Sequence, residues 1–268
     1  MISKSLLRFE REAKSIYRNM IKPFPGKNRI AISSFPSSAS TYLKTLLSKV
    51  FDAPVVNIHT GYEYNEDALL RYYCSNFISN SHLPCRSPDV EKLNKFQLKP
   101  IILVRNIFDV LISAKDHTDR YDNFNPIIDR IPRCWQELSE ERKKEVILKF
   151  YLPFYVNFYV SWYYAKVENR IHCEFLAHED FTDDKKIFEK LPHVLNSIGV
   201  PTSKESLAKH KAIMQQERNG KKSEISKLIN KGVKGRGSDY FSDDEKQYIF
   251  NYFTMYNDVD FEKIGIKK

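Results

Sequence analysis

Short apolar runs alternate with amphipathic segments through most of the chain. The clearest run is KPIILVR, residues 99–105, where four apolar residues stand between a proline and an arginine. Each such run is followed by a polar loop and then by a helical pattern. Uninterrupted apolar runs are typical of strands buried on both faces. Strands that alternate with helices predict an α/β fold, a central parallel sheet flanked by helices on both faces.

The expected elements follow one another without a linker that would divide two domains. We predict strands at 29–34, 53–59, 76–84, 99–105 and 171–181. Helices are predicted at 39–51, 62–74, 106–115, 137–166, 182–197 and 203–215, with a last helix after the polar segment 217–246. The region 137–166 is expected to kink at Pro153. A chain of 268 residues is long enough for one such domain with a sizeable core.

The N-terminus, residues 1–28, is predicted to form a basic amphipathic helix outside the domain 29–268. Residues 1–29 hold eight Lys or Arg and two Glu, a net charge of +6 out of +9 for the whole chain. Apolar residues recur there at helical spacing. We favour a helix packed on the domain with a solvated basic face. A helix lying on an anionic membrane, or one docking a polyanion, is the open alternative.

Composition excludes several classes of protein. A hydrophobic content of 42% excludes a disordered chain. The four cysteines have no CxxC pairing and no metal-like spacing with histidine, so we expect reduced thiols and no metal. No apolar run reaches 18 residues and no signal-peptide core appears, so we expect a cytoplasmic protein, in the alternative peripheral at a membrane. No RNP, KH or zinc-finger pattern accompanies the pI near 9.2, so no nucleic-acid partner is expected.

Three loops should meet where parallel strands end, the edge at which α/β sheets bind ligands. The loop after Ser34 offers helix-start N–H groups and hydroxyl groups to an anion, although such residues equally form ordinary helix caps. The next offers His82, which could take a proton from a hydroxyl group or simply pack. The third offers Arg105, with Ser113 eight residues later. An arginine there binds a phosphate or carboxylate, or pairs with Asp109.

These segments resemble motifs of the sulfotransferases that use 3′-phosphoadenosine 5′-phosphosulfate (PAPS). SFPSSASTYL resembles their 5′-phosphosulfate loop, SHLP their histidine segment and LVRNIFDVLIS their 3′-phosphate motif. FLAHEDF resembles a later strand end, and NKGVKGRGSDYFS resembles the segment that closes over the cofactor. The five motifs keep the family's order across about residues 29–253. The resemblance implies the sulfotransferase fold, which is similar to that of P-loop NTPases.

The resemblance also implies a role for each matching residue. His82 would be the general base that deprotonates an acceptor hydroxyl, which attacks sulfur in line and expels adenosine 3′,5′-bisphosphate (PAP). The positions implied to bind the cofactor are Ser37, Ser38, Ala39, Ser40, Thr41, Tyr42, Arg105, Ser113, His178, Lys231 and Gly232.

The chain departs from the family's pattern at four positions. Ser37 replaces the catalytic lysine, Asn80 a second lysine and Asn230 an arginine, while Ala39 replaces a glycine. Three cations are thus missing around a multiply charged product, and losing one such donor costs about 3 kcal/mol of transition-state stabilisation. Another cation must compensate, or turnover is slow or absent. The candidates are Lys44, which is expected to lie too far along its helix, Lys115, Lys234 and Arg236.

Several functional hypotheses remain open. The first is a sulfotransferase whose hydroxyl acceptor is a carbohydrate or glycolipid, with an anionic acceptor mildly favoured by the basic surface. The second is a degenerate relative that binds PAP or PAPS without turnover. A basic polyanion-binding protein comes third, and a small-molecule kinase is disfavoured because no Walker lysine is present. Aromatic residues that line the acceptor site, or belong to the core, are Tyr62, Tyr64, Tyr72, Tyr73, Tyr121 and Phe124.

Overall fold

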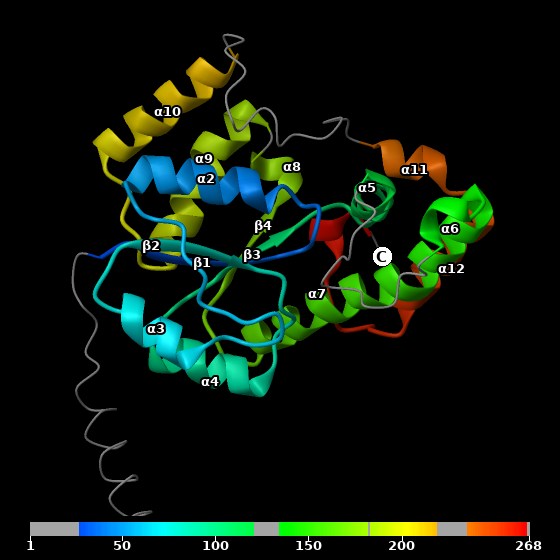
Figure 1. Cartoon of the computed structure of the whole chain (residues 1–268), viewed down its shortest axis with the longest axis horizontal. Helices are drawn as coiled ribbons and strands as arrows, with labels where there is room; N and C mark the ends of the chain where they lie inside the picture. Colours follow the sequence, from blue (N-terminus) through cyan, green and yellow to red (C-terminus); the bar gives the residue numbers. More distant parts are fainter. Residues whose placement is uncertain (1–26, 121–133, 182, 219–234, 267–268) are drawn as a thin grey trace, which may run out of the picture.

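The structure is a computed structural model, and it describes residues 27–120, 134–181, 183–218 and 235–266. Four parallel strands form the central sheet in the order β2-β1-β3-β4 (Figure 1). Their bounds are Arg29–Ser34 for β1, Phe77–Ser81 for β2, Ile101–Val104 for β3 and Glu174–Ala177 for β4. Helices cover both faces of this sheet in one domain, which confirms the predicted fold class.

Helices fill most of the remaining described chain. The α-helices are α2 Ser40–Phe51, α3 Glu66–Tyr72, α4 Ser87–Lys95, α5 Ile107–Arg120, α6 Glu140–Val146, α7 Leu152–Val167, α8 His178–Phe181, α9 Asp184–Ser197, α10 Lys204–Arg218, α11 Arg236–Tyr240 and α12 Asp243–Thr254. Short 3-10 turns occur at Trp135–Glu137 and Glu262–Ile264. The predicted helix at 1–28 falls almost wholly outside the described residues.

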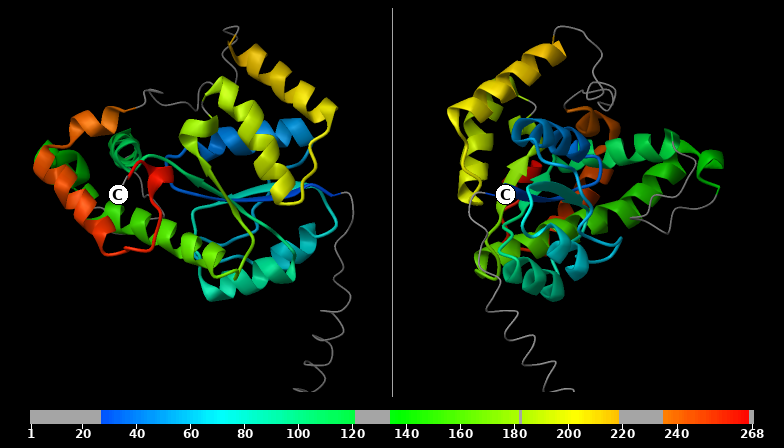
Figure 2. Two further views of the ribbon diagram at one scale, coloured as in Figure 1. Left: turned by 180° about the vertical axis from the view of Figure 1, so that it is seen from behind. Right: turned by 60° about the vertical axis from the view of Figure 1, so that its left-hand side comes forward.

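Alternating strand residues feed two separate hydrophobic cores. On β1, Ala31 faces one core while Ile30 and Ile32 face the other. The first core is rich in aromatic side chains from α7, and the second joins aliphatic side chains of α2 and α9 to the sheet. Figure 2 shows α2, α9 and α10 on one side of the sheet and α3 and α4 on the other. Burial on both sides explains why the strands read as continuous apolar runs.

Three expectations about local structure need correction. Residues 53–59 form no strand, because only single bridges join Val55 to Ile78 and His59 to Tyr64. The expected helix 137–166 is divided into α6, a π-helical stretch at Ile147–Tyr151, and α7. Pro153 lies in the first turn of α7, where a proline is tolerated. Helix α4 was not expected, since its sequence is largely polar.

Three features of the described residues bear on the excluded classes of protein. Within them, no helix is both long enough and apolar enough to cross a membrane. All four cysteines carry free thiols, two buried and two exposed. No cluster of three or more metal-ligating side chains occurs in the described ranges.

Candidate functional site

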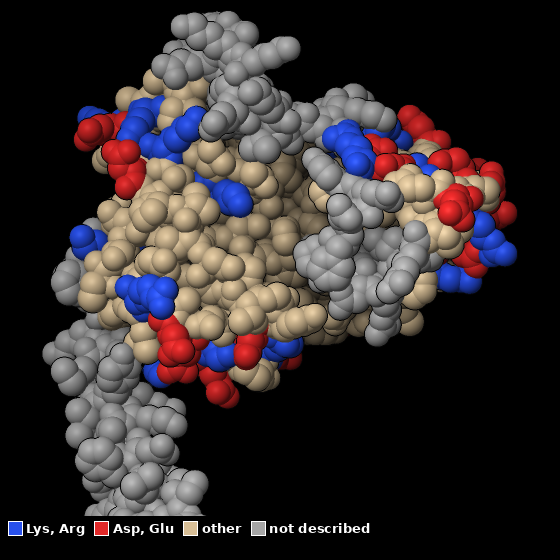
Figure 3. All heavy atoms as spheres, viewed as in Figure 1, with Lys and Arg blue, Asp and Glu red and all other residues tan. Residues whose placement is uncertain are grey.

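Three loops meet at the carboxyl edge of the sheet, as predicted from the strand order. They follow Ser34 of β1, Ser81 of β2 and Val104 of β3. Figure 3 shows a face of the molecule on which acidic and basic groups gather at the periphery. Its central part, between α2 and α3, is uncharged apart from basic atoms over α2.

The loop between β1 and α2 is held in one conformation by its neighbours. The backbone N–H of Phe35 donates to Leu103 of β3 at 2.9 Å, and the Ser38 hydroxyl donates to the Phe35 carbonyl at 2.6 Å. From α7, the Tyr155 hydroxyl donates to the Pro36 carbonyl at 3.0 Å. These bonds fix a turn whose backbone leads directly into α2.

Two residues of this loop adopt the left-handed backbone conformation. Ser37 and Ala39 both have φ of 63°, a region in which side chains other than glycine are uncommon. Ala39 stands where the resembling motif has a glycine, so its φ gives the physical reason for a glycine there. Ala39 therefore adopts a strained conformation that glycine would take without cost.

The N-terminus of α2 lacks a side-chain cap. Its N-cap residue is Ala39, which makes no side-chain hydrogen bond, and no acidic residue occupies the first turn. N–H groups at a helix start need an acceptor, and the helix dipole favours a negative one. The hydroxyls of Ser40 and Thr41 begin the helix beside these groups. The arrangement suits an anion better than the ordinary capping interpretation does.

His82 follows β2 and faces the end of β1. Its Nδ1 lies 2.9 Å from the carbonyl oxygen of Ser34. The Ser34 hydroxyl also lies 3.1 Å from Nδ1, but it donates its proton to Asn80 Oδ1. Because the carbonyl only accepts, this arrangement favours the tautomer with the proton on Nδ1 and the lone pair on Nε2. Burial lowers the pKa of His82 to about 4, so its imidazole is neutral at pH 7. A neutral imidazole with a defined tautomer can accept a proton at Nε2.

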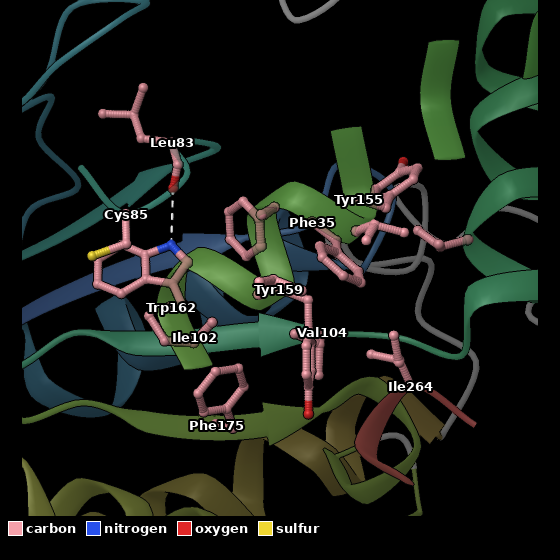
Figure 4. Packing of buried hydrophobic residues seen from close by; sticks show 14 of the residues in the cluster. Phe35, Leu83, Cys85, Ile102, Val104, Tyr155, Tyr159, Trp162, Phe175 and Ile264 are labelled. Atoms are coloured by element: carbon pink, nitrogen blue, oxygen red, sulfur yellow. Dashed lines mark hydrogen bonds between the residues drawn. The ribbon is translucent and has the colours of Figure 1, made fainter. Parts of the chain in front are cut away.

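The segment that carries His82 is fixed by hydrogen bonds from α7 and β1. The Leu83 carbonyl accepts from Trp162 Nε1 at 3.0 Å, as Figure 4 shows, and from the Ser33 hydroxyl at 2.8 Å. Two residues on, the backbone N–H of Cys85 donates to the Ser161 hydroxyl at 2.9 Å. The histidine therefore extends from a rigid stretch of backbone.

Asn80 links the first two loops. Its side-chain oxygen accepts from the Ser34 hydroxyl at 2.9 Å, and its side-chain nitrogen donates to the Ser40 hydroxyl at 3.4 Å. The residue that replaces a family lysine is thus in contact with the first residue of α2. Position 80 lies at the candidate anion site, where a positive charge would act on a bound ligand.

Arg105 joins the third loop to the first. Its Nη1 donates to the Ser37 carbonyl at 3.0 Å, while its Nε is buried and has no hydrogen-bond partner among the described residues. Burial lowers the pKa of Arg105, and the charges of Asp109 and Glu179 partly offset this effect. In the described structure no ion pair joins Arg105 to Asp109, contrary to the alternative that they form one. A buried guanidinium nitrogen without an acceptor suits a bound anion.

Asp109 has a different role, which the sequence did not reveal. Its carboxylate accepts from the backbone N–H of Gly235 at 2.9 Å and of Gly237 at 2.8 Å. Asp109 thereby attaches the start of α11 to α5. The implied cofactor positions Lys231 and Gly232 precede Gly235 in the sequence and lie outside the described residues. The sequence showed only that Asp109 lies four residues after Arg105. It gave no sign that Asp109 binds Gly235, more than 120 positions away.

The structure describes some of the other residues implied to bind the cofactor and not the rest. Ser113 is buried on α5, eight residues after Arg105. Tyr42 packs partly against the aliphatic core from α2. His178 begins α8 at the end of β4, with its Nδ1 3.8 Å from the Glu179 carboxylate. Lys231 and Gly232 lie outside the described residues, so their roles stay predictions.

Two of the four candidate compensating cations are already paired with carboxylates. Lys115 contacts the carboxylates of Asp119 at 2.7 Å and Glu140 at 3.0 Å. Arg236 forms an ion pair with Asp116. Lys234 lies outside the described residues. Since Lys115 and Arg236 have carboxylate partners of their own, neither is free to replace the missing lysines.

The candidate acceptor aromatics divide between core and surface. Tyr64 is buried, and its hydroxyl lies 3.1 Å from that of Ser81. Tyr72 and Tyr73 pack against Phe77 and Phe96. Tyr62 is 68% exposed. Tyr121 and Phe124 lie outside the described residues. The core interpretation therefore holds for Tyr64, Tyr72 and Tyr73.

Comparison with solved structures finds the same fold. A mouse sulfotransferase, SULT7A1, complexed with PAP aligns with 92% of this chain and 90% of its own chain, at a TM-score of 0.60 and 17% identity. A retinol dehydratase in complex with androsterone and the inactive cofactor PAP aligns with 90% of this chain and 84% of its own chain, at a TM-score of 0.55 and 14% identity. No protein-family model and no curated protein matches the chain. The fold is thus that of the PAPS-dependent sulfotransferases.

Proposed function

We propose that the protein is a PAPS-dependent sulfotransferase that acts on a hydroxyl group. The observation that carries the proposal is the meeting of three groups at one sheet edge: the uncapped start of α2, Arg105 and His82. The motifs in the sequence and the shared fold support the same conclusion. The two solved structures named above both contain PAP.

The residues at this edge suit a ligand with two separate phosphate groups. The 5′-phosphosulfate of PAPS would lie against the N–H groups and hydroxyls of 38–42. Its 3′-phosphate would lie against Arg105, whose buried Nε has no other acceptor in the described chain, with Ser113, Lys231 and Gly232. PAPS would supply the sulfuryl group: the acceptor oxygen would bond to sulfur, the bond from sulfur to the 5′-phosphate oxygen would break, and PAP would leave.

His82 would hold and move the proton of the acceptor. The Ser34 carbonyl keeps the proton of the imidazole on Nδ1, so Nε2 can accept the proton of the acceptor hydroxyl. The acceptor oxygen then becomes nucleophilic as it loses its proton. The low pKa of His82 keeps the base unprotonated across the physiological range.

The uncharged central surface in Figure 3 informs the choice of acceptor. A polyanionic glycan requires several cations around its site. The excess positive charge that favoured such an acceptor lies mainly in 1–29, which holds +6 of the +9, and most of that segment is outside the described structure. We propose a neutral alcohol, a sugar or an apolar hydroxyl compound, ahead of an anionic glycan or glycolipid.

A second candidate function is binding of PAP or PAPS without turnover. The absence of lysines at Ser37 and Asn80 favours it, because the leaving oxygen lacks its usual neutralising charge. Labelled PAPS offered with a panel of alcohols and saccharides separates the two functions. Sulfated product from the wild type, reduced at least a hundredfold in His82→Asn with PAP affinity kept, supports the enzyme. PAP binding without product from any acceptor, unchanged by Ser37→Lys, favours the binding protein.

A further inference from the structure

The site needs a positive charge that its expected positions do not supply. Ser37 and Asn80 are neutral where lysines are expected. Lys115 and Arg236 are bound to carboxylates elsewhere. Lys44 is different: within the part of the chain that the structure describes, no carboxylate pairs with it. Its charge is therefore available to a ligand.

Lys44 lies closer to the anion site than the sequence count suggests. Seven positions separate it from Ser37, but α2 begins only at Ser40, so Lys44 is about one turn into the helix. Residues four apart share a helix face, and helical side chains lean toward the N-terminus. A rise of about 6 Å separates Lys44 from Ser40 along the axis, and a four-carbon stem spans it. The expectation counted loop residues before Ser40 as helical, and the start of α2 corrects that count.

The face that Lys44 shares with Ser40 is the one turned toward β2. Asn80 donates to the Ser40 hydroxyl from that side. The charge of Lys44 also contributes to lowering the pKa of His82, together with His59 and His117. Lys44 is thus near both the missing lysine position at Asn80 and the candidate base. A lysine near the positive end of a helix gains nothing from the helix dipole, so helix stability does not explain it.

We propose that Lys44 binds the 5′-phosphosulfate end of the cofactor and takes over the charge lost at Asn80 and Ser37. This inference rests on the proposed function and names a residue for it. The resembling sulfotransferases carry a lysine at the position of Asn80. Here Lys44 on α2 would provide that positive charge, one helical turn from the phosphate-binding N–H groups. Lys44 would interact with the phosphate of PAP through an ammonium hydrogen bond.

Calorimetric titration with two nucleotides tests this assignment. PAP carries a 5′-phosphate, and adenosine 3′-monophosphate lacks it. For Lys44→Gln we expect PAP affinity to fall about tenfold, the loss of one charged hydrogen bond, with the affinity for adenosine 3′-monophosphate unchanged. Lys49→Gln is the matched control, because Lys49 is exposed in the last turn of the same helix. It should leave both affinities unchanged.

A double variant tests the relocation itself. Asn80→Lys in the Lys44→Gln background should restore most of the lost PAP affinity, which a merely structural role for Lys44 would not allow. Equal PAP affinity in wild type and Lys44→Gln, or an equal loss for both nucleotides, would overturn the assignment while leaving the proposed function intact. No PAP binding by the wild type would overturn both.

Discussion

The carboxylate of Asp109 on α5 accepts a hydrogen bond from the backbone N–H of Gly237 on α11, at 2.8 Å. The same carboxylate also accepts from Gly235. Two segments more than 120 residues apart are thereby attached at the candidate cofactor edge. Asp109 therefore holds the start of α11 in position on α5.

Replacing Asp109 should loosen the attachment of α11 to α5. Asp109 is 3% exposed, so Asp109→Ala leaves two backbone N–H groups without acceptors and should lower the free energy of unfolding by about 2–3 kcal/mol. Urea denaturation measures the loss, and amide exchange should accelerate at Gly235 and Gly237. Asp239→Ala, at an exposed residue of α11, is the control and should change stability little. Unchanged exchange at both glycines in Asp109→Ala would contradict the positioning role.

The contact between α11 and α5 also leaves no room for a side chain at Gly237. A Cβ there would lie 2.1 Å from the backbone carbonyl carbon of Phe108. Gly237→Ala must push the two helices apart and should cost about 1–3 kcal/mol, measured by the same denaturation. Gly61→Ala provides the matched control, since nothing lies within 4 Å of a Cβ at that glycine. Equal stabilities of the two variants would refute the close approach.

The left-handed conformation of Ala39 predicts a substitution that stabilises the protein. Glycine adopts φ of 63° without steric cost, which outweighs its greater freedom in the unfolded chain. Ala39→Gly should raise the free energy of unfolding by about 0.5–1 kcal/mol. Ala68→Gly in α3 should have the opposite sign, because glycine is unfavourable inside a helix. A destabilised Ala39→Gly would argue against the loop conformation described above.

Buried histidines should make the fold sensitive to acid. His210 on α10 is 3% exposed, and burial lowers its pKa to about 4. Between about pH 6.5 and 4 the unfolded chain binds a proton that the folded chain does not, so stability present above pH 6.5 is lost as the pH falls. The loss is at most about 3 kcal/mol for this group. His82, with a pKa also lowered to about 4, contributes in the same direction.

The variant His210→Phe tests this acid sensitivity. It keeps an aromatic contact with Phe188, whose ring centroid lies 4.8 Å away, and removes the titrating group. Its stability should fall less than that of the wild type between pH 6.5 and 4. His193→Phe, at an exposed position on α9, should follow the wild type. Parallel pH profiles for wild type and His210→Phe would exclude His210 as a source of the effect.

Local pattern predicted the strands and their loops well. Strand β1 has the expected bounds, because the run 29–34 is apolar on both faces and ends in polar residues. Helix α4 was missed although Pro88 in its first turn is a helix-start signal, since Val90 and Leu93 are the only large apolar residues in an otherwise polar segment. The segment 53–59 has strand-like residues but pairs only at Val55 and His59. Sheet pairing depends on partners elsewhere in the chain, which a local pattern does not contain.

Part of the candidate site could likewise be predicted from the sequence and part could not. Its positions at strand ends follow from the sequence, because all parallel strands end at one edge. The contacts of Asp109 with Gly235, and of Tyr155 with Pro36, join residues more than a hundred positions apart and could not be predicted. The place of Lys44 along its helix was misjudged because loop residues before Ser40 were counted as helical.

Calorimetric titration of PAP into wild type and Arg105→Ala, with circular dichroism to verify that the variant folds, shows whether this edge of the sheet binds the nucleotide. We predict micromolar binding by the wild type, at least tenfold weaker binding by Arg105→Ala, and far weaker binding of adenosine 5′-monophosphate, which lacks the 3′-phosphate. Absence of PAP binding by the wild type, or equal affinity in folded Arg105→Ala, would contradict the claim that this edge of the sheet is a PAPS site.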